Sequence, residues 1–122
     1  MSRMMRTVAV SMAMEMRRPA SRQENLDYIE ETVVMAAVVR PDVICLPEVF
    51  PLAGLDVPVD DWCTAQDLDV LRRLAKKYRC NLVGSIYKER RGRLFNTAVW
   101  VDRRGTVAGW YDKIHPTETE IA

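Results

Sequence analysis

The sequence has no long hydrophobic run, no excess of charge of one sign and almost no histidine. No run of apolar residues approaches the roughly 18 that a membrane-spanning helix needs. Eighteen basic and seventeen acidic side chains give a net charge of +1, and no face-sized block of one sign stands out. This balance argues against binding to nucleic acid or to an anionic membrane. The single histidine, His115, argues against a zinc site built on histidine ligands.

Cysteine is also scarce, and its spacing does not indicate a metal site. Cys45, Cys63 and Cys80 are odd in number and form neither a C-x-x-C pair nor another metal-binding spacing. Reduced thiols in a reducing compartment are the simplest explanation. The apolar residues 8–14 run directly into Glu15 without a small-residue cleavage site after them, so they are interpreted as a strand and not as a signal peptide. We therefore expect a cytoplasmic protein.

The length and the apolar pattern are typical of one α/β domain. A chain of 122 residues is expected to form a single domain and to bury about 65% of its unfolded surface. Five apolar segments are predicted to be strands: residues 7–14, 42–46, 81–87, 94–102 and 106–111. The last three follow one another across short polar turns, which is typical of an antiparallel meander.

Two helices are predicted between these strands. The first begins at a capping box of Ser21 and Glu24, keeps helical spacing as far as Arg40, and ends at Pro41. The second covers residues 66–79. The first strand, helix and second strand make a βαβ-like unit. We predict an α/β fold with a mixed sheet, helices on one of its faces, and no element after Lys113 that closes the other face.

Two short charged segments follow predicted strand ends. Glu48 lies within Leu-Pro-Glu-Val-Phe-Pro after the second strand, and Lys113 follows the last strand. Taken singly, each is equally an ordinary solvated charge. Together, at strand ends where catalytic groups are common, they indicate a general base and a cation that stabilises an oxyanion. The stiff apolar flanks of Glu48 lead us to expect a desolvated carboxylate. A site of this kind also needs a nucleophile, and no convincing one is visible.

In their order along the chain, these segments resemble the nitrilase, or carbon–nitrogen hydrolase, superfamily. That family's strand ending in Pro-Glu is matched by PDVICLPEVFP, which places Glu48 on its general base. Its Phe-Asn-x-Ala strand, turn and following strand are matched by FNTAVWVDRRGTVAGWYDKIHP, which places Lys113 on its catalytic lysine. The Pro-Thr-x-x-Glu motif of its nitrilase branch is matched by PTETE, which places a second catalytic glutamate at Glu120.

The resemblance implies hydrolysis of a non-peptide C–N bond in a small amide, carbamoyl compound or nitrile. It implies a Cys-Glu-Lys mechanism with Glu48, Lys113 and Glu120 as catalytic residues, and no metal or organic cofactor. The family's nucleophilic cysteine follows a later strand, and none of the three cysteines here stands at its position. Residues 1–122 are accordingly expected to be the N-terminal part of the family's αββα sandwich, truncated before the nucleophile and inactive alone.

Two other interpretations stay open. The chain is alternatively a non-catalytic nitrilase-like subunit or remnant that acts by association with a partner. A sheet face without cover would expose apolar surface and favour self-association, as a homo-oligomer or otherwise. The remaining alternative is an unrelated small α/β domain, in which the matches to the family are fortuitous.

Other polar residues of these motifs have structural interpretations. For His115, a structural place beside the lysine is favoured over acid–base chemistry. Asn96, a polar residue in an apolar strand, must find hydrogen-bond partners, and a structural role near the lysine loop is favoured over substrate contact. Glu120 lies near a chain end that is expected to fray, where it would be solvated together with Glu118.

Overall fold

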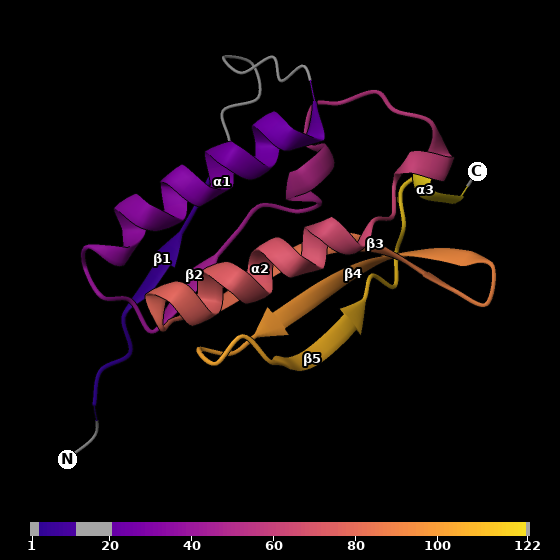
Figure 1. The fold of residues 1–122 in the computed structure, drawn as a ribbon. Coiled ribbons are helices and arrows are strands. Elements are labelled where there is room, and N and C mark those ends of the chain that lie inside the picture. The colour runs from indigo at the N-terminus through magenta and orange to yellow at the C-terminus, as the bar shows by residue number, and fades with distance from the viewer. Residues whose placement is uncertain (1–2, 12–20, 122) are drawn as a thin grey trace.

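The sheet has the mixed topology that the sequence predicts. The computed structural model, drawn in Figure 1, describes residues 3–11 and 21–121. Within these residues, five strands form one sheet in chain order. The strands are β1 (Thr7–Ala9), β2 (Val43–Cys45), β3 (Asn81–Arg90), β4 (Arg93–Val101) and β5 (Val107–Asp112). β1, β2 and β3 are parallel, and β3, β4 and β5 are antiparallel, so the βαβ unit and the meander are both confirmed.

Two long helices pack side by side on one face of this sheet. They are α1 (Arg22–Ala37) and α2 (Ala65–Tyr78), and Figure 1 shows both on the same side. α1 begins where the capping box predicts, because the Ser21 hydroxyl accepts a hydrogen bond from the Glu24 backbone N–H at 3.2 Å. Shorter elements are η1 (Phe50–Leu52), η2 (Val59–Asp61) and α3 (Glu118–Ile121). None of the described helices is both long and apolar enough to cross a membrane.

The core fills the space between these helices and the sheet. It combines apolar side chains of both helices with inward-facing side chains of the strands: Leu26, Ile29, Val33, Ile44, Leu71, Leu74, Leu82, Ile86, Val99 and Val101. The buried ring of Phe50, in η1, closes one end. Gly84 makes room for it, because a Cβ at that position would lie 3.1 Å from the Phe50 ring. The segment that follows Glu48 is therefore anchored in the core.

The opposite face of the sheet carries no helix of the described residues. Val83 pairs with Trp100, and Ala98 pairs with Tyr111, so these four side chains point to the same side. Trp100 is 42% exposed and Tyr111 is 60% exposed. The prediction of helices on one face only is confirmed, and the other face presents aromatic surface to solvent.

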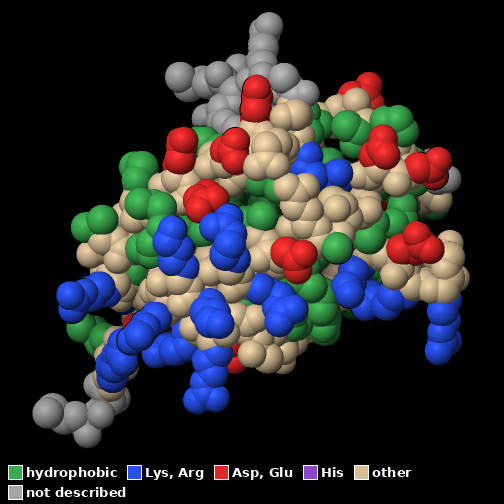
Figure 2. All heavy atoms as spheres, in the orientation of Figure 1, with side chains coloured by type: hydrophobic (Ala, Val, Ile, Leu, Met, Phe, Trp, Pro, Cys, Tyr) green, Lys and Arg blue, Asp and Glu red, His purple; other side chains and the backbone are tan. Residues whose placement is uncertain are grey.

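Charged side chains are distributed unevenly around this frame. Figure 2 shows Lys and Arg side chains gathered on the lower part of the view. Lys76 and Arg79, at the C-terminal end of α2, meet Arg103 and Arg104 of the turn before β5, and the four line a hollow of about 420 Å³. Lysines in the last turn of α2 also complement its dipole.

Three element boundaries differ from the prediction by more than one residue. α1 ends at Ala37 and not near Arg40, which has a left-handed backbone (φ 48) because the chain turns before Pro41. β1 ends at Ala9, and residues 12–14 of the predicted strand lie outside the described residues. β3 runs on to Arg90, since the hairpin with β4 holds its register up to the two-residue turn at 91–92.

The chain end also differs, because it contains an element. No helix was predicted after Lys113, and the structure forms a single helical turn there, α3. In Figure 1 this turn lies beside the segment of η2, away from the open face of the sheet. α3 therefore leaves the open face of the sheet uncovered, but it positions Glu120, one of the candidate site residues.

Candidate active site

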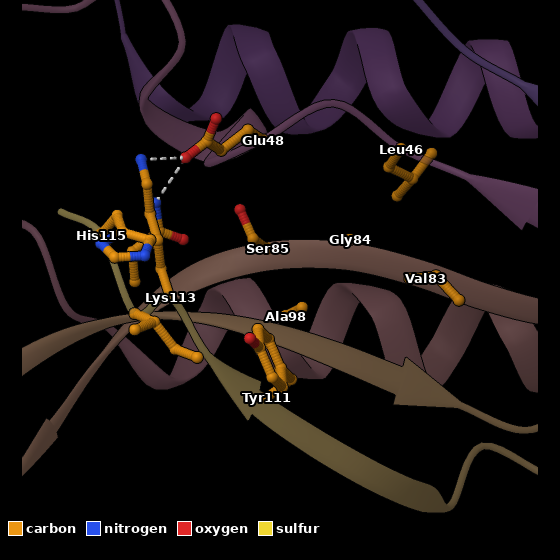
Figure 3. Close-up of a pocket in the computed structure, with 11 residues that line it drawn as sticks. Leu46, Glu48, Val83, Gly84, Ser85, Ala98, Tyr111, Lys113 and His115 are labelled. Carbon is orange, nitrogen blue, oxygen red and sulfur yellow. Dashed lines mark hydrogen bonds and ion pairs between the residues drawn. The ribbon is translucent and has the colours of Figure 1, made fainter. Parts of the chain in front are cut away.

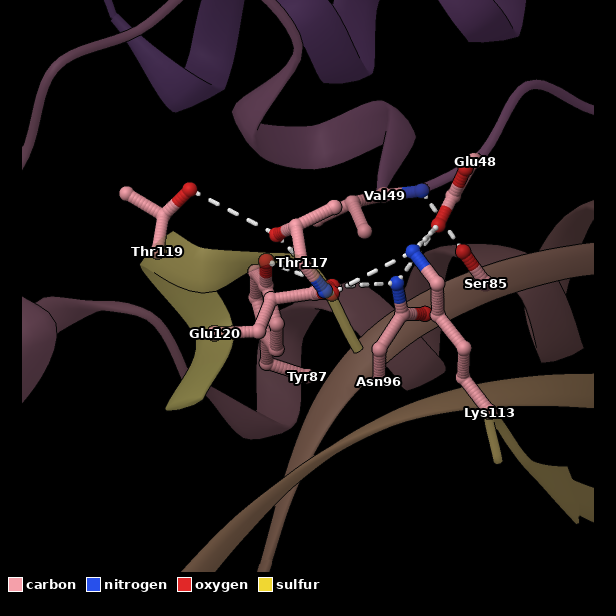
Figure 4. Close-up of polar contacts among 9 residues, drawn as sticks. All are labelled: Glu48, Val49, Ser85, Tyr87, Asn96, Lys113, Thr117, Thr119 and Glu120. Atoms are coloured by element: carbon pink, nitrogen blue, oxygen red, sulfur yellow. Dashed lines mark hydrogen bonds and ion pairs between the residues drawn. The ribbon is translucent and has the colours of Figure 1, made fainter. Parts of the chain in front are cut away.

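The structure brings Glu48, Lys113 and Glu120 together. The Lys113 Nζ atom lies 2.7 Å from Glu48 Oε1 and 3.2 Å from Glu120 Oε2. Figure 4 shows the ammonium group between the two carboxylates. The three side chains come from the loop after β2, the residue after β5, and α3. An ion pair on each side makes Lys113 the centre of the cluster.

Glu48 is placed by a strained turn at the end of β2. The next residue, Val49, has a left-handed backbone with φ 45 and ψ 44, which is costly for a β-branched residue. Its N–H donates to Ser85 Oγ of β3 at 2.6 Å, and Phe50 is buried behind it. The Glu48 side chain itself is 60% exposed. The expectation of a desolvated carboxylate is wrong, because Phe50 and Pro51 are buried in the core while Glu48 stays outside it.

Lys113 is held by the main chain of β4. Its N–H donates to the Asn96 carbonyl at 2.8 Å, which extends the β4–β5 pairing by one step. The hydrogen bond to Glu48 raises the pKa of the Lys113 ammonium group, and the hydrogen bond to Glu120 acts in the same direction. The protonated form is therefore favoured, and Lys113 acts as a fixed cation and not as a base.

Glu120 is ordered by its own helical turn. Its Oε2 accepts from the Thr117 N–H at 2.7 Å and from the Thr117 hydroxyl at 3.1 Å. The side chain is only 9% exposed, so the expectation of a frayed, solvated carboxylate is wrong. Burial opposes ionisation, but hydrogen bonds from Thr117, Asn96 and Lys113 outweigh it and lower the pKa of Glu120 to about 2.

The signal for this turn is present in the sequence. Thr117-x-x-Glu120 has the form of a capping box, as Ser21 and Glu24 do. In the structure the Glu120 carboxylate reaches back to the Thr117 N–H, which is one half of that motif. The same residues thus serve as a family motif and as the cap of a helical turn.

Two further polar residues of the site come from β3 and were not predicted. Ser85 accepts the Val49 N–H, and the Tyr87 hydroxyl donates to Glu120 Oε1 at 3.3 Å. Burial, together with the negative charge of Glu120, raises the pKa of Tyr87 to about 12, so the hydroxyl stays protonated and a donor. No sequence signal marks either residue, because both contacts depend on how β3 is aligned with the loops.

An open cavity of about 710 Å³ borders the cluster. Figure 3 shows Glu48 and Lys113 at one end of it and Val83, Ala98 and Tyr111 along its floor. His115 also lines it. A small molecule with an apolar body and one polar group would match this lining. The cavity opens on the sheet face that the helices leave uncovered.

None of the three cysteines lines this cavity. Cys45 is within β2, Cys63 is exposed, and Cys80 is buried. Burial raises the pKa of Cys80, which disfavours a thiolate. Among residues 3–11 and 21–121, no group of three or more His, Cys, Asp or Glu side chains is arranged to hold a metal ion.

The cluster has the groups for proton transfer and for oxyanion stabilisation. An ammonium group has three donors, and within the described part of the chain Lys113 uses two of them, on Glu48 and Glu120. One donor is left for a substrate oxygen. Glu48, exposed beside it, is placed to accept a proton from a nucleophile or from water.

Comparison with known proteins identifies the family. The family model for carbon–nitrogen hydrolases matches residues 7–122. The chain belongs to the carbon–nitrogen hydrolase family. The "Hydrolase in agr operon" of Staphylococcus aureus is 34% identical to this chain over 79 residues, 61% of this chain and 30% of the relative. A protein of the same name from Staphylococcus lugdunensis is 32% identical over 79 residues, 61% of this chain and 33% of the relative.

Solved structures share the fold. A carbon–nitrogen hydrolase from Helicobacter pylori G27 superposes with a TM-score of 0.80 at 21% identity, over 95% of this chain and 41% of that structure. An amidase from Nesterenkonia sp. superposes with a TM-score of 0.78 at 25% identity, over 97% of this chain and 46% of that structure. The chain spans about a third of the length of the curated relatives and under half of these structures.

Proposed function

We propose that residues 1–122 form the N-terminal part of a cytoplasmic, cysteine-dependent hydrolase that cleaves the C–N bond of small amides. Carbamoyl compounds and nitriles are the other candidate substrates. The observation that carries the proposal is the Lys113 ammonium group between Glu48 and Glu120, at the end of an open cavity. Amides come first because the Nesterenkonia protein, which shares the fold at 25% identity, is an amidase.

The nucleophile in this proposal is a cysteine from outside residues 1–122. The Nesterenkonia amidase has been solved after addition of acrylamide at its active site cysteine, which supports a cysteine mechanism in the family. Here Glu48 takes the thiol proton as the sulfur attacks the carbonyl carbon, and Lys113 stabilises the developing oxyanion. The C–N bond breaks as Glu48 returns the proton to the leaving nitrogen. Water, activated by Glu48, then hydrolyses the thioester and restores the thiol.

Glu120 has a supporting part in this mechanism. With a pKa of about 2 it is a carboxylate throughout the neutral range, and it is too well shielded to exchange protons easily. Its charge favours the ammonium form of Lys113 and fixes the direction of the side chain. Glu48, which is exposed, is left as the residue that exchanges protons.

Hydrolysis of simple amides by two chains tests the proposal. Purified residues 1–122 should show no turnover above background. If the reading frame continues beyond residue 122 into a strand and a cysteine, the longer chain should turn over amides. In that chain, Lys113→Met should lower kcat by about 10²–10³-fold, the cost of removing one oxyanion donor. Lys88→Met is the matched control, because it makes the same substitution outside the cluster, at a lysine whose ammonium group lies over the Trp110 ring.

Two results would contradict the proposal. Turnover by residues 1–122 that disappears in Cys63→Ala or Cys80→Ala would show that a nucleophile had been overlooked. Full activity of Lys113→Met in the longer chain would remove the oxyanion role. A native stop codon after residue 122 would favour the alternative function.

The alternative is a non-catalytic subunit that acts by association. The open face of the sheet, with Trp100 and Tyr111 exposed, is the observation that favours it. Self-association of this face would occur whether or not the site is active, so the two functions are separated by turnover and not by oligomeric state.

A further inference from the structure

One residue of β4 contacts all three members of the cluster. The Asn96 side-chain nitrogen Nδ2 lies 2.8 Å from Glu48 Oε1 and 2.8 Å from Glu120 Oε1. The main-chain carbonyl of Asn96 accepts the Lys113 N–H at 2.8 Å. Figure 4 shows the amide group between the two carboxylates. Glu48 and Glu120 are therefore bridged twice, once by the ammonium group and once by this amide.

The chemistry of an amide fixes the orientation of this bridge. Carboxylates only accept hydrogen bonds, so the NH₂ group of Asn96 must face them, and its oxygen must point away. Both hydrogens of the NH₂ group are then used, one on each carboxylate. Asn96 is 8% exposed, so water competes weakly for these donors. The Asn96 side chain therefore holds the two carboxylates at a fixed distance from each other.

The charge of the site explains why a neutral donor is suited to this position. Two carboxylates face one ammonium group, so the cluster carries a net negative charge, and like charges in one site disfavour ionisation. The other groups that face Glu120 are the Tyr87 hydroxyl and Thr117, which are also neutral donors. Asn96 differs from both because it also reaches Glu48.

We propose that Asn96 is a positioning residue that holds the Glu48 and Glu120 carboxylates on either side of the Lys113 ammonium group. Its meaning for catalysis rests on the proposed function. The contacts themselves can be measured in residues 1–122 without any turnover, so the two proposals can fail separately.

The experiment compares two Asn→Leu variants by NMR. Asn96→Leu removes both donors and keeps the number and branching of the side-chain heavy atoms. Asn81→Leu is the matched control, because Asn81 also lies in the sheet and donates its side-chain amide, at 2.8 Å, to the Asp42 carbonyl outside the site. The carboxyl carbon of Glu120 is followed from pH 1.5 to pH 6, so that a midpoint near 2 falls within the titration. In the wild type and in Asn81→Leu it should remain ionised at pH 3, whereas Asn96→Leu should raise its titration midpoint by about one pKa unit or more.

A second readout separates positioning from a merely structural role. The Lys113 amide is bonded to the main chain of Asn96, so its hydrogen-exchange protection should persist in Asn96→Leu. A raised Glu120 midpoint with a protected Lys113 amide supports the proposal. An unchanged midpoint, an equal rise in Asn81→Leu, or loss of Lys113 protection overturns it.

The unmodified chain gives a further test if Asn96→Leu does not fold. The two side-chain amide protons of Asn96 should exchange with water slowly, because each donates to a carboxylate. Replacing Glu120 by glutamine should shift one of them and leave the Asn81 amide unchanged. Asn96 amide protons that exchange as fast as those of a solvent-exposed asparagine would overturn the proposal. If Asn96 passes these tests while Lys113→Met remains active in the longer chain, the positioning role of Asn96 is supported and the proposed mechanism is contradicted.

Discussion

Replacing Glu120 by glutamine and Asp67 by asparagine should change the pH dependence of stability in opposite directions. Burial opposes the ionisation of Glu120, but hydrogen bonds outweigh it and lower its pKa from 4.5 to about 2. Asp67 lies in the first turn of α2, 1% exposed and 3.2 Å from the Arg22 side chain. There burial outweighs the attraction of Arg22 and raises the pKa from 3.8 to about 6.

The folded pKa of Glu120 lies below its unfolded value, so the unfolded chain binds more protons between these two values. Stability from this group is then present above pH 4.5 and is lost as pH falls towards 2. The full effect corresponds to about 3 kcal/mol, of which about 2 kcal/mol develops between pH 3 and pH 5. Glutamine cannot ionise, so Glu120→Gln lacks this rise.

Asp67 acts with the opposite sign. Its folded pKa lies above its unfolded value, so the folded chain binds more protons between 3.8 and about 6, and stability falls as pH rises through that interval. The fall amounts to about 1.5 kcal/mol between pH 3 and pH 5 and about as much again by pH 7. In the wild type the two groups nearly cancel between pH 3 and pH 5.

Urea unfolding followed by tryptophan fluorescence, at several chain concentrations, measures these effects. The free energy of unfolding of the wild type minus that of Glu120→Gln should increase by about 2 kcal/mol from pH 3 to pH 5. The wild type minus Asp67→Asn should decrease by about 1.5 kcal/mol over the same interval. Differences between variants remove the contribution of other carboxylates. Two flat differences, or two of the same sign, would refute the reasoning.

Two further predictions concern packing and association. Gly105→Ala should lower the free energy of unfolding by about 2 kcal/mol or more, because Gly105 has φ +79 and a Cβ there would lie 2.8 Å from the Arg72 carbonyl oxygen. Gly109→Ala is the control, because a Cβ at Gly109 would meet open space. Equal effects of the two substitutions in urea unfolding would contradict this prediction. Trp100→Thr should weaken self-association in sedimentation equilibrium more than Trp110→Thr. The two side chains are equally exposed, at 42% and 41%, but of the two only Trp100 lies on the open face of the sheet. Equal weakening by the two substitutions would contradict association through the open face.

Much of the fold follows from local patterns. The Ser21 cap, the apolar spacing of both helices and the short polar turns of the meander are signals within a few residues, and the corresponding elements formed. The predicted boundaries are wrong where contacts between residues distant in the sequence determine the end of an element. β3 extends to Arg90 because β4 pairs with it along its whole length, and no property of residues 88–90 alone indicates this.

The candidate site was less accessible to prediction from the residues alone. Glu48 and Lys113 were marked by their places after strands, and Glu120 only by the family resemblance. Ser85 and Tyr87 could not be predicted, because their contacts depend on the register between β3, β4 and the loops. The exposure of Glu48 was predicted wrongly for a related reason: the sequence shows which residues flank it, but not the turn at Val49 that points them inward.

The helical turn at the chain end and the contacts among the site residues depend on each other. α3 has only four residues, too few to be helical on their own. What holds it is Glu120, whose one carboxylate oxygen accepts the Thr117 N–H while the other accepts from Asn96. The same carboxylate is buried and ionised because these donors surround it. Protonating Glu120, or removing its partners, would therefore release the helical turn and leave Lys113 with Glu48 as the carboxylate that holds its ammonium group.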